Sequence, residues 1–344
     1  MNAPAEAVDF EVARLDDYLR GWLGGAAPTR VRRTQGGMSN PTYFVERGDW
    51  RAVLRKQPNS RLAPSAHAID REFRVLAALQ RTSVPTPAPI RYCSDAEALG
   101  TPFYLMEWLD GRLFHDYATP GLAREERREF YRAMCATLAA IHKLDFRALG
   151  LGDFGKPGNY FKRQLSRWSG LWGQYRRGEG DNPDLDYIVG WLCERVPESE
   201  TLALCHGDFR FANLMFHKRE PRVIGVLDWE LSTLGHPLID LAYNSQAWRM
   251  APDENGGLIG LPLEDLGIPA EREYLEMYYE MSGVREPLTR FHLVFAMFRG
   301  AVGSAGVAAR GDRGNGVLPD AARIGRHLAH AYASRGMALI KEER

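Results

Sequence analysis

Three oxygen-bearing side chains in the 344-residue chain have the types and spacing that phosphoryl transfer requires: Asp208, Asn213 and Asp228. The apolar residues 202–204 lead into a His-Gly-Asp sequence that ends at Asp208, and Asn213 follows five residues later. A second apolar run ends at Asp228. Each of these side chains therefore stands at or just after a short predicted strand. Such a set could hold a divalent metal ion against a polyphosphate and orient a hydroxyl for attack.

Each of these residues has a candidate role in that chemistry, which needs a metal-bound triphosphate and an acceptor hydroxyl near a carboxylate. Asp208 is the candidate carboxylate, and Asn213 and Asp228 offer the oxygen ligands that Mg²⁺ prefers. His206 and Gly207 are expected to shape the loop, because glycine permits a tight backbone turn. Taken singly, the three polar residues would be turn residues or a helix N-cap. Their order and their positions near strands favour the site.

The elements that must position these residues change in character along the chain. Hydrophobic spacing predicts a helix at 10–23, strands at 42–45, 50–55, 90–92 and 103–108, and a helix at 69–79. Further helices are predicted at 124–144, 239–248, 271–281, 288–309 and 319–341. The pattern indicates a small, mostly β lobe, a short joint near residue 107, and a larger helical lobe that carries the metal-site candidates.

The totals exclude several other classes of protein. The formal net charge is zero, so bulk electrostatics does not favour nucleic acid or a membrane surface. The four cysteines show no C-x-x-C spacing, which favours a reducing compartment and disfavours structural zinc. The N-terminus lacks a signal-like sequence, and no apolar stretch reaches the ~18 residues that a membrane span needs. A cytoplasmic protein is the resulting expectation.

Several motifs together resemble the aminoglycoside-phosphotransferase family, the small-molecule branch of the protein-kinase-like fold. They are His206-Gly207-Asp208 with Asn213, Asp228-Trp229-Glu230, Gly235-His236-Pro237 with Asp240, Gly36-Gly37-Met38-Ser39-Asn40, Val53-Leu54-Arg55, Arg71-Glu72 and Tyr104-Leu105-Met106-Glu107. The resemblance covers nearly the whole chain. It implies an α+β fold of two lobes, with a small antiparallel β lobe at 1–107 that binds nucleotide. A larger helical lobe at 108–344 would hold the catalytic loop and the acceptor pocket.

The resemblance also implies ATP and Mg²⁺ as cofactors and a role for each motif. Asp208 would be the catalytic base, Asn213 and Asp228 would bind the metal ion, and Asp240 would brace the loop that contains His206. A simple helix cap is the alternative for Asp240. The residues implied to bind nucleotide are Gly36, Gly37, Ser39, Asn40, Arg55, Lys56, Glu72, Glu107 and Leu109. Among these, backbone groups of Glu107 and Leu109 would meet adenine.

Which basic residue on the 50–55 strand faces the phosphates stays open. Many kinases place lysine there, and Lys56 is the only lysine in the first lobe. Strand alternation puts Lys56 on the face of Ala52 and Leu54, and Arg55 on the face of Val53. The family pattern favours Arg55 as the partner of Glu72. The residue that does not face the phosphates is expected to be a solvated surface charge.

A small-molecule acceptor is favoured over a protein by two departures from protein kinases. Glycine stands at Gly207 where protein kinases carry the arginine that reads a phosphorylated activation loop. Only eleven residues separate Asp228 from Asp240, too few for a peptide-docking segment, and no Ala-Pro-Glu sequence follows. The expected activity is therefore a small-molecule kinase that phosphorylates a hydroxyl.

The identity of the acceptor depends on charge and on a narrower resemblance. Residues 154–180 and 297–326 are rich in arginine, which opposes a polycationic aminoglycoside and favours an acceptor with an anionic part. Solvated helix faces are the alternative. Both segments resemble the kinase-like region fused to acyl-CoA dehydrogenases, which suggests a hydroxyacyl thioester or hydroxy acid and a dehydrogenase partner acting in trans. The weak candidates for the acceptor pocket are Arg163, Trp168, Arg299 and Arg310.

Two other functions remain as alternatives: phosphorylation of an aminoglycoside or other antibiotic, and a catalytically silent nucleotide-binding protein. The choice between ATP and GTP and the oligomeric state also stay open.

Overall fold

The computed structural model describes residues 8–34, 40–59, 69–156, 158–179, 182–199, 201–312 and 320–342. The chain forms two compact units, one made of residues 1–111 and 224–230 and the other of residues 112–223 and 231–344. The segment 224–230 thus returns to the first unit, whereas the sequence placed it in the helical lobe. It carries Asp228, which therefore belongs to the same unit as the sheet.

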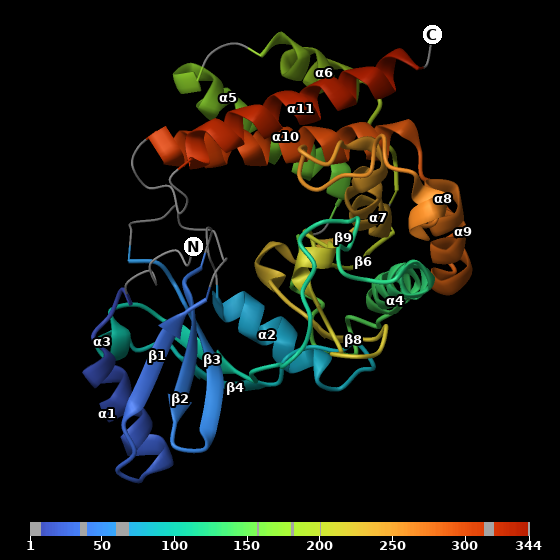
Figure 1. Ribbon diagram of the computed structural model, residues 1–344. Coiled ribbons are helices and arrows are strands. Elements are labelled where there is room, and N and C mark those ends of the chain that lie inside the picture. Colours follow the sequence, from blue (N-terminus) through green and yellow to red (C-terminus); the bar gives the residue numbers. More distant parts are fainter. Residues whose placement is uncertain are drawn as a thin grey trace. The chain divides into compact units, whose positions relative to one another are not determined.

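The first unit is a five-stranded antiparallel sheet with helices on both faces (Figure 1). The strand order is β1-β2-β3-β5-β4. The elements are α1 (Val12–Leu23), β1 (Thr29–Arg33), β2 (Thr42–Arg47), β3 (Trp50–Lys56), α2 (Ile69–Leu79), β4 (Pro89–Cys93), α3 (Ala96–Leu99), β5 (Phe103–Met106) and β8 (Val223–Val226). The predicted small antiparallel β region is confirmed.

The two faces of this sheet follow from the alternation of side chains along its strands. Tyr43, Val45 and Leu54 pack against Leu15 and other residues of α1 and α3 in one buried cluster. The intervening positions face α2, where Phe73 meets Tyr104 with ring centroids 5.8 Å apart. The sheet therefore has an apolar face under α1 and a second face, under α2, on which polar side chains can gather.

Strand β1 was not predicted, because its sequence lacks apolar alternation. Its five residues are Thr-Arg-Val-Arg-Arg, and only Thr29 among them is buried. The strand lies at the sheet edge, where charged side chains reach solvent and discourage further pairing. Arg32 also places its guanidinium 4.6 Å from the centroid of Phe44 on the neighbouring strand. Pairing with β2 therefore determines this strand more than its own pattern does.

The second unit is mainly helical, as the sequence predicted. Its elements are α4 (Arg124–His142), α5 (Tyr160–Glu179), α6 (Pro183–Cys193), β6 (Ala203–Cys205), η1 (Phe211–Asn213), β7 (Leu214–Phe216), η2 (Trp229–Leu231, shared with the first unit), β9 (Thr233–Gly235), α7 (Pro237–Ser245), η3 (Gln246–Arg249), α8 (Leu263–Leu266), α9 (Glu271–Ser282), α10 (Arg290–Asp312) and α11 (Ala321–Lys341). Strands β6 and β9 pair antiparallel beneath the loop that contains Asp208.

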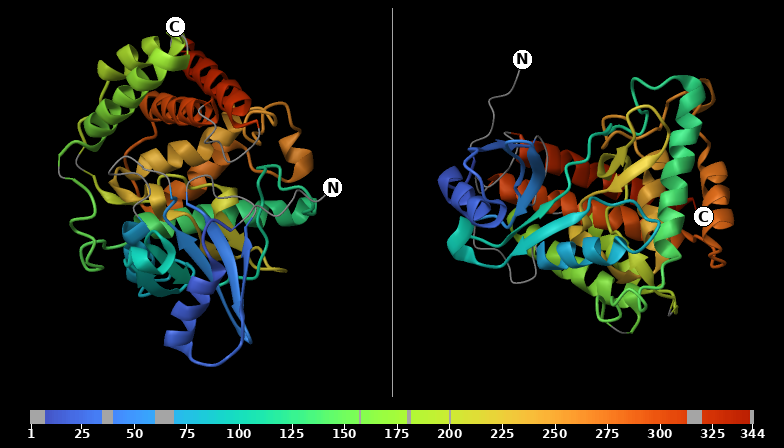
Figure 2. Two further views of the ribbon diagram at one scale, coloured as in Figure 1. Left: turned by 90° about the vertical axis from the view of Figure 1, so that its left-hand side faces the viewer. Right: turned by 90° about the horizontal axis from the view of Figure 1, so that it is seen from below.

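The long helices α10 and α11 lie side by side, with α5 and α6 packed on them (Figures 1 and 2). Helix α10 is long and apolar enough to cross a membrane by length and composition, contrary to the expectation that no stretch would be. Yet 72% of its most apolar window is buried inside the unit. This burial is what a core helix requires, and the buried residues of α10 include several alanines and a glycine.

The four cysteines, Cys93, Cys135, Cys193 and Cys205, are all free thiols. Three of them are buried and only Cys193 is exposed. The cytoplasmic location itself stays a prediction.

The close approach of α10 and α11 can be tested at Gly325. A Cβ atom at this position would lie 2.5 Å from the backbone nitrogen of Ala308 and 2.7 Å from the carbonyl oxygen of Ser304. We therefore expect Gly325→Ala to lower the free energy of unfolding by about 1–3 kcal/mol through overpacking. Denaturant unfolding followed by circular dichroism measures this change.

Gly303 on α10 provides the matched control, since a Cβ atom there would meet nothing within 4 Å. Gly303→Ala is expected to stabilise the protein by up to about 1 kcal/mol through helix propensity. Equal stability of the two variants would contradict this packing of α11 on α10.

Candidate active site

The loop after β6 holds Asp208 and Asn213 together. The side-chain nitrogen of Asn213 donates to Asp208 twice, to the backbone oxygen and to Oδ2, each at 2.8 Å. Because the amide nitrogen is engaged in this way, Oδ1 is the atom of Asn213 left to bind a cation. Side-chain hydrogen bonds therefore hold Asp208 and Asn213 together, which two independent turn residues would not require.

Gly207 allows the backbone to turn directly before Asp208. Its φ angle is +86°, in the left-handed region, and a Cβ atom would lie 2.5 Å from the backbone oxygen of Leu231. Only glycine fits both constraints without strain. The ring of His206 supports the same turn, since its Nδ1 accepts the backbone N–H of Asp208 at 3.2 Å. His206 and Gly207 thus shape the loop as predicted.

Asp240, in the first turn of α7, braces this loop from below. Its Oδ2 accepts the backbone N–H of His206 at 2.6 Å, and its Oδ1 accepts that of Gly207 at 2.9 Å. The N-cap of α7 is His236, so Asp240 is not the helix cap considered as an alternative. Asp240 is fully buried, and it accepts the backbone N–H groups of two consecutive residues of the loop.

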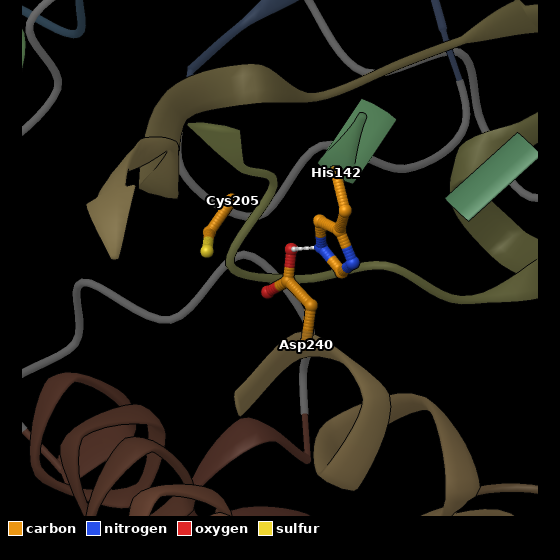
Figure 3. A group of neighbouring side chains, drawn as sticks. All are labelled: His142, Cys205 and Asp240. Atoms are coloured by element: carbon orange, nitrogen blue, oxygen red, sulfur yellow. Dashed lines mark hydrogen bonds and ion pairs between the residues drawn. The ribbon is translucent and has the colours of Figure 1, made fainter. Parts of the chain in front are cut away.

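His142, at the end of α4, completes the support of Asp240 (Figure 3). Its Nε2 lies 3.4 Å from Asp240 Oδ2, and its Nδ1 lies 2.6 Å from the hydroxyl of Tyr278. Burial alone would raise the pKa of Asp240, but hydrogen bonding to His142 and Gly207 and the charges of His142 and His206 lower it below its ordinary value. Asp240 is therefore held as a carboxylate.

Cys205 lies beside Asp240 and His142 and forms with them the group whose side chains resemble a metal-ligand set (Figure 3). The arrangement fits a metal ion poorly. Both oxygens of Asp240 already accept backbone hydrogen bonds, and the thiol of Cys205 points to the carbonyl of His236 at 3.5 Å. Burial also raises the pKa of Cys205 well above its ordinary value, so the thiolate that a metal binds is disfavoured.

Two residues that the sequence did not single out, Tyr243 and Arg210, also hold Asp208. The hydroxyl of Tyr243 donates to Oδ1 at 2.5 Å, and Nε of Arg210 lies 3.3 Å from the same oxygen. Burial and the charge of Asp208 raise the pKa of Tyr243 well above its ordinary value, so the phenol stays a neutral donor. Tyr243 lies one turn after Asp240 on α7. This spacing is the signal in the sequence that could have identified Tyr243 as a partner of Asp208.

In the first unit, Arg55 on β3 lies among three carboxylates. Its Nε donates to Glu72 Oε2 at 2.8 Å, Nη2 donates to Asp228 Oδ1, and Nη2 lies 3.5 Å from Glu230 Oε2. Burial would lower the pKa of Arg55, but Asp228 and Glu72 raise it well above its ordinary value. The predicted pairing of Arg55 with Glu72 is present.

This group around Arg55 carries more negative than positive charge, because one guanidinium faces three carboxylates. Asp228 has φ = +62°, an unusual conformation for a residue other than glycine, and its side chain is part-exposed. Glu72 also accepts the backbone N–H of Trp229 at 3.2 Å, which fixes the segment that presents Asp228. Excess carboxylate charge with hard oxygen donors fits Mg²⁺.

Lys56 points to the opposite face of the sheet from Arg55. Its Nζ donates to Asn59 Oδ1 at 2.7 Å and lies 3.3 Å from Asp9 Oδ2, and the side chain is fully buried. Strand alternation had assigned Lys56 to this face, but the expectation of a solvated surface charge is wrong. Burial lowers the pKa of Lys56, and the aspartate beside it opposes this shift.

The predicted phosphate-covering turn can be followed only at its end. Gly36, Gly37 and Ser39 lie outside the described residues. Asn40 is fully buried, and its Nδ2 donates to Glu230 Oε2 at 3.1 Å. Asn40 Oδ1 is also buried and has no hydrogen-bond partner among the described residues. Asn40 therefore connects the end of this turn to the segment that carries Asp228.

The joint predicted near residue 107 offers two backbone groups that could pair with adenine, the carbonyl of Glu107 and the N–H of Leu109. The backbone N–H of Glu107 donates to Ala88 at 2.8 Å, so only its carbonyl remains available. No backbone hydrogen bond joins Leu109 to another described residue. Its side chain packs where a Cβ on Gly225 would stand, which explains a glycine within β8.

The four candidates for the acceptor pocket lie in different surroundings. Arg299 is buried on α10, and its Nη2 donates to the carbonyl of Gly207 at 3.0 Å. Trp168 on α5 lies beside it, 5.5 Å from ring centroid to guanidinium carbon. Arg163 instead lines a shallow pocket with Asn159, Lys162 and Ser166. Arg310 is exposed and stands eleven residues, or roughly 16 Å, along α10 from Arg299.

Comparison with known proteins agrees with this geometry. The profile described as "Phosphotransferase enzyme family" matches residues 30–279. Acyl-CoA dehydrogenase family member 10 of Mus musculus is 39% identical over 343 residues, which cover 95% of this chain but only 32% of that relative. The chain thus spans about a third of that protein.

Two solved structures share the fold. A putative aminoglycoside phosphotransferase from Ralstonia eutropha is 37% identical, with a TM-score of 0.83 over 97% of this chain and 99% of that one. A mutant aminoglycoside phosphotransferase in ternary complex with AMP-PNP and hygromycin B has a TM-score of 0.61 over 94% of this chain and 98% of that one. At 16% identity, the second likeness shows the fold alone.

The brace at Asp240 makes a testable prediction about pH. Because its pKa is lowered in the folded state, Asp240 stabilises the protein fully above its unfolded pKa of about 3.9, and this contribution is lost as the pH falls through the folded value. Asp240→Asn should therefore lower the melting temperature most at neutral pH. The difference from wild type should shrink below about pH 4.

Asp265→Asn, on the exposed helix α8, serves as the control and should leave the melting temperature nearly unchanged at every pH. A constant difference between wild type and Asp240→Asn from pH 7 to pH 3 would show that the charge of Asp240 does not brace the loop.

Proposed function

The chain belongs to the phosphotransferase enzyme family, and from this premise we propose that it is an ATP- and Mg²⁺-dependent kinase for a small hydroxyacyl compound. One observation carries the proposal. Asp208 is held by Asn213, Tyr243 and Arg210 on a loop that Asp240 fixes from below. A carboxylate restrained in this way is suited to receive the proton of an attacking hydroxyl.

Asp208 retains the capacity to bind that hydroxyl. Each carboxylate oxygen can accept about two hydrogen bonds, and Asn213 and Tyr243 each bind a different oxygen. The side chain is also 18% exposed, so an acceptor can reach it. Tyr243 and Arg210 then keep the carboxylate oriented while the acceptor hydroxyl donates its hydrogen bond to it.

The residues around Arg55 are proposed to hold the nucleotide. Arg55 offers a guanidinium to the phosphates, and the carbonyl of Glu107 and the N–H of Leu109 can pair with the amino and ring-nitrogen edge of adenine. Asp228 in the first unit and Asn213 Oδ1 in the second are each a proposed ligand of Mg²⁺, which would neutralise phosphate charge when bound. A solved structure with the same fold binds AMP-PNP, which supports the use of a nucleoside triphosphate, and we take ATP as the proposed donor.

The proposed acceptor is a hydroxyacyl-CoA or a free hydroxy acid. The similarity to acyl-CoA dehydrogenase family members supports a substrate of acyl-thioester type. A dehydrogenase acting in trans would then be the partner. The cations near α5 and the buried Arg299 oppose a polycationic aminoglycoside, which would need acidic groups in their place.

Antibiotic phosphorylation remains the second candidate, because the solved relative from Ralstonia eutropha bears the name of a putative aminoglycoside phosphotransferase. Raised tolerance to aminoglycosides in bacteria that express the chain, but not its Asp208→Asn variant, would favour that function. A silent nucleotide-binding protein is disfavoured, because Asp208, Asn213 and Asp228 are all present.

Replacement of the base tests the proposal directly. Asp208→Asn should lower kcat about 10²–10⁴-fold, since a general base contributes that much, while nucleotide still binds. The measurement is Mg²⁺-dependent ADP release with a panel of hydroxyacyl-CoAs, hydroxy acids, sugars, amino alcohols and aminoglycosides. Chelation of Mg²⁺ should abolish turnover and added Mg²⁺ should restore it.

Asp265→Asn is again the control, since it removes an exposed carboxylate far along the chain from the loop. Undiminished turnover by Asp208→Asn would end the assignment of the base. Failure of the wild type to release ADP with every acceptor would revive the silent alternative.

A matched pair of neighbouring cations tests which residue serves the phosphates. Arg55→Met should raise KM for ATP at least about 10-fold, because a charged hydrogen bond to phosphate is lost. Lys56→Met should leave KM for ATP within about threefold, since Lys56 faces α1. It should lower the melting temperature, because Asp9 then loses its buried partner. The opposite pattern of KM values would assign the phosphate contact to Lys56.

A further inference from the structure

Arg299 is an unusual residue for the middle of a core helix. It is only 8% exposed and lies on α10, a long helix that is apolar enough to cross a membrane by length and composition. Its Nη2 donates to the carbonyl of Gly207, the residue before the catalytic carboxylate. This single hydrogen bond places a permanent positive charge directly against the catalytic loop.

The remaining polar atoms of Arg299 are buried and have no hydrogen-bond partner in the part of the chain that the structure describes. Both Nε and Nη1 are in this state, and so is Nε1 of the neighbouring Trp168. No carboxylate of a described residue lies within ion-pairing distance of the guanidinium. Buried donors and buried charges are almost always paired in folded proteins. Three unpaired donors on two adjacent side chains are therefore free to bind a hydrogen-bond acceptor from outside the described chain.

The position of this partner follows from Tyr243. The guanidinium of Arg299 lies 5.8 Å from the ring centroid of Tyr243 and 5.5 Å from that of Trp168. The hydroxyl at the far end of Tyr243 donates to Asp208. One aromatic ring thus spans the distance from the unpaired donors to the catalytic carboxylate. A ligand bound to both would carry its hydroxyl and its hydrogen-bond acceptor only a few bonds apart.

We propose that Arg299 and Trp168 bind the acyl oxygen of the acceptor and so select hydroxyacyl compounds over other alcohols. This inference rests on the proposed kinase function and identifies the residues that read the acceptor. The shared chemistry is an oxygen on an acyl carbon near the hydroxyl, either a free carboxylate or a thioester carbonyl. The aromatic rings beside the guanidinium would cover the adjoining apolar chain. A cationic acceptor is disfavoured, because it would meet an unpaired buried cation.

The same arrangement predicts two separable effects of Arg299. Its contact with Gly207 positions the catalytic loop, and loss of this contact should lower turnover with every acceptor alike. Its unpaired donors bind the acyl oxygen, and their loss should weaken only acceptors that carry such an oxygen. The comparison of acceptors with and without an acyl oxygen therefore separates recognition from loop support.

The test uses hexanoic acids with a hydroxyl at carbon 2, 3, 4 or 5, their CoA thioesters, and the matching secondary hexanols. In the wild type and in Arg299→Lys, Arg299→Met and Trp168→Phe, KM and kcat are measured by ADP release. Binding of the same compounds is measured by calorimetry in an Asp208→Asn background, which needs no turnover. Circular dichroism melting identifies any variant that does not fold.

We expect Arg299→Met to weaken the binding of acyl compounds about 10- to 100-fold, because a charged hydrogen bond is lost. The binding of hexanols should weaken at most threefold. Arg299→Lys should retain part of the affinity for acyl compounds. Trp168→Phe keeps an aromatic ring but removes the N–H, so its affinity for acyl compounds should fall about 3- to 10-fold. If Arg299→Met weakens the binding of the free acids, the acyl oxygen is that of a carboxylate. If it weakens the binding of the CoA thioesters, the acyl oxygen is that of a thioester carbonyl.

Equal losses for acyl compounds and hexanols would overturn the inference and leave Arg299 a support of the loop alone. Absence of any saturable binding of acids and thioesters to the wild type would also overturn it. If acyl compounds bind through Arg299 but none is phosphorylated, the inference stands and the proposed kinase function fails.

Discussion

The hydrogen bonds to the buried carboxylate of Asp240 are the interactions on which the loop around Asp208 depends. The loop turns at Gly207 in a left-handed conformation, and this turn directs two consecutive backbone N–H groups into the protein, where water cannot satisfy them. Asp240 accepts both, and His142 offsets the cost of burying its charge. Asp208 directly follows this fixed turn, and the side chains of Asn213, Tyr243 and Arg210 then hold its carboxylate. The contact of Arg299 with Gly207 is possible for the same reason.

In the first unit, charged side chains lie together on one face of the sheet. Alternation along β3 sends Arg55 to one side and Lys56 to the other. Each is buried beside at least one carboxylate, but the two groups of partners differ in their net charge. Lys56 meets Asp9 and Asn59 and closes a local structural contact. Arg55 meets Glu72, Asp228 and Glu230, and this group retains negative charge that a divalent cation can neutralise.

The hydrophobic pattern and the family resemblance together were sufficient to predict the fold class, and the resemblance predicted the pairing of Arg55 with Glu72. These features depend on residues close in sequence or on strand alternation, which a pattern records directly. Tyr243, Arg210 and His142 were missed because their roles arise from tertiary packing around Asp208 and Asp240, and no local pattern encodes that packing. The burial of Lys56 was missed for a related reason. A lysine in an alternating strand looks solvated until its partner, 47 residues earlier, is known. Strand β1 likewise depends on its neighbour more than on its own residues.

The two units contain uncompensated charges of opposite sign, and this difference constrains what each can bind. Around Arg55 the carboxylates outnumber the cation, so the first unit favours a metal ion and the phosphates that the metal brings. Around Arg299 the balance is reversed, because a buried guanidinium with unpaired donors stands beside aromatic rings and no described carboxylate pairs with it. A cationic acceptor would increase that imbalance, whereas an acyl oxygen would relieve it. Since the same arginine also holds Gly207, the residue that recognises the acceptor would be linked to the loop that activates its hydroxyl by a single side chain.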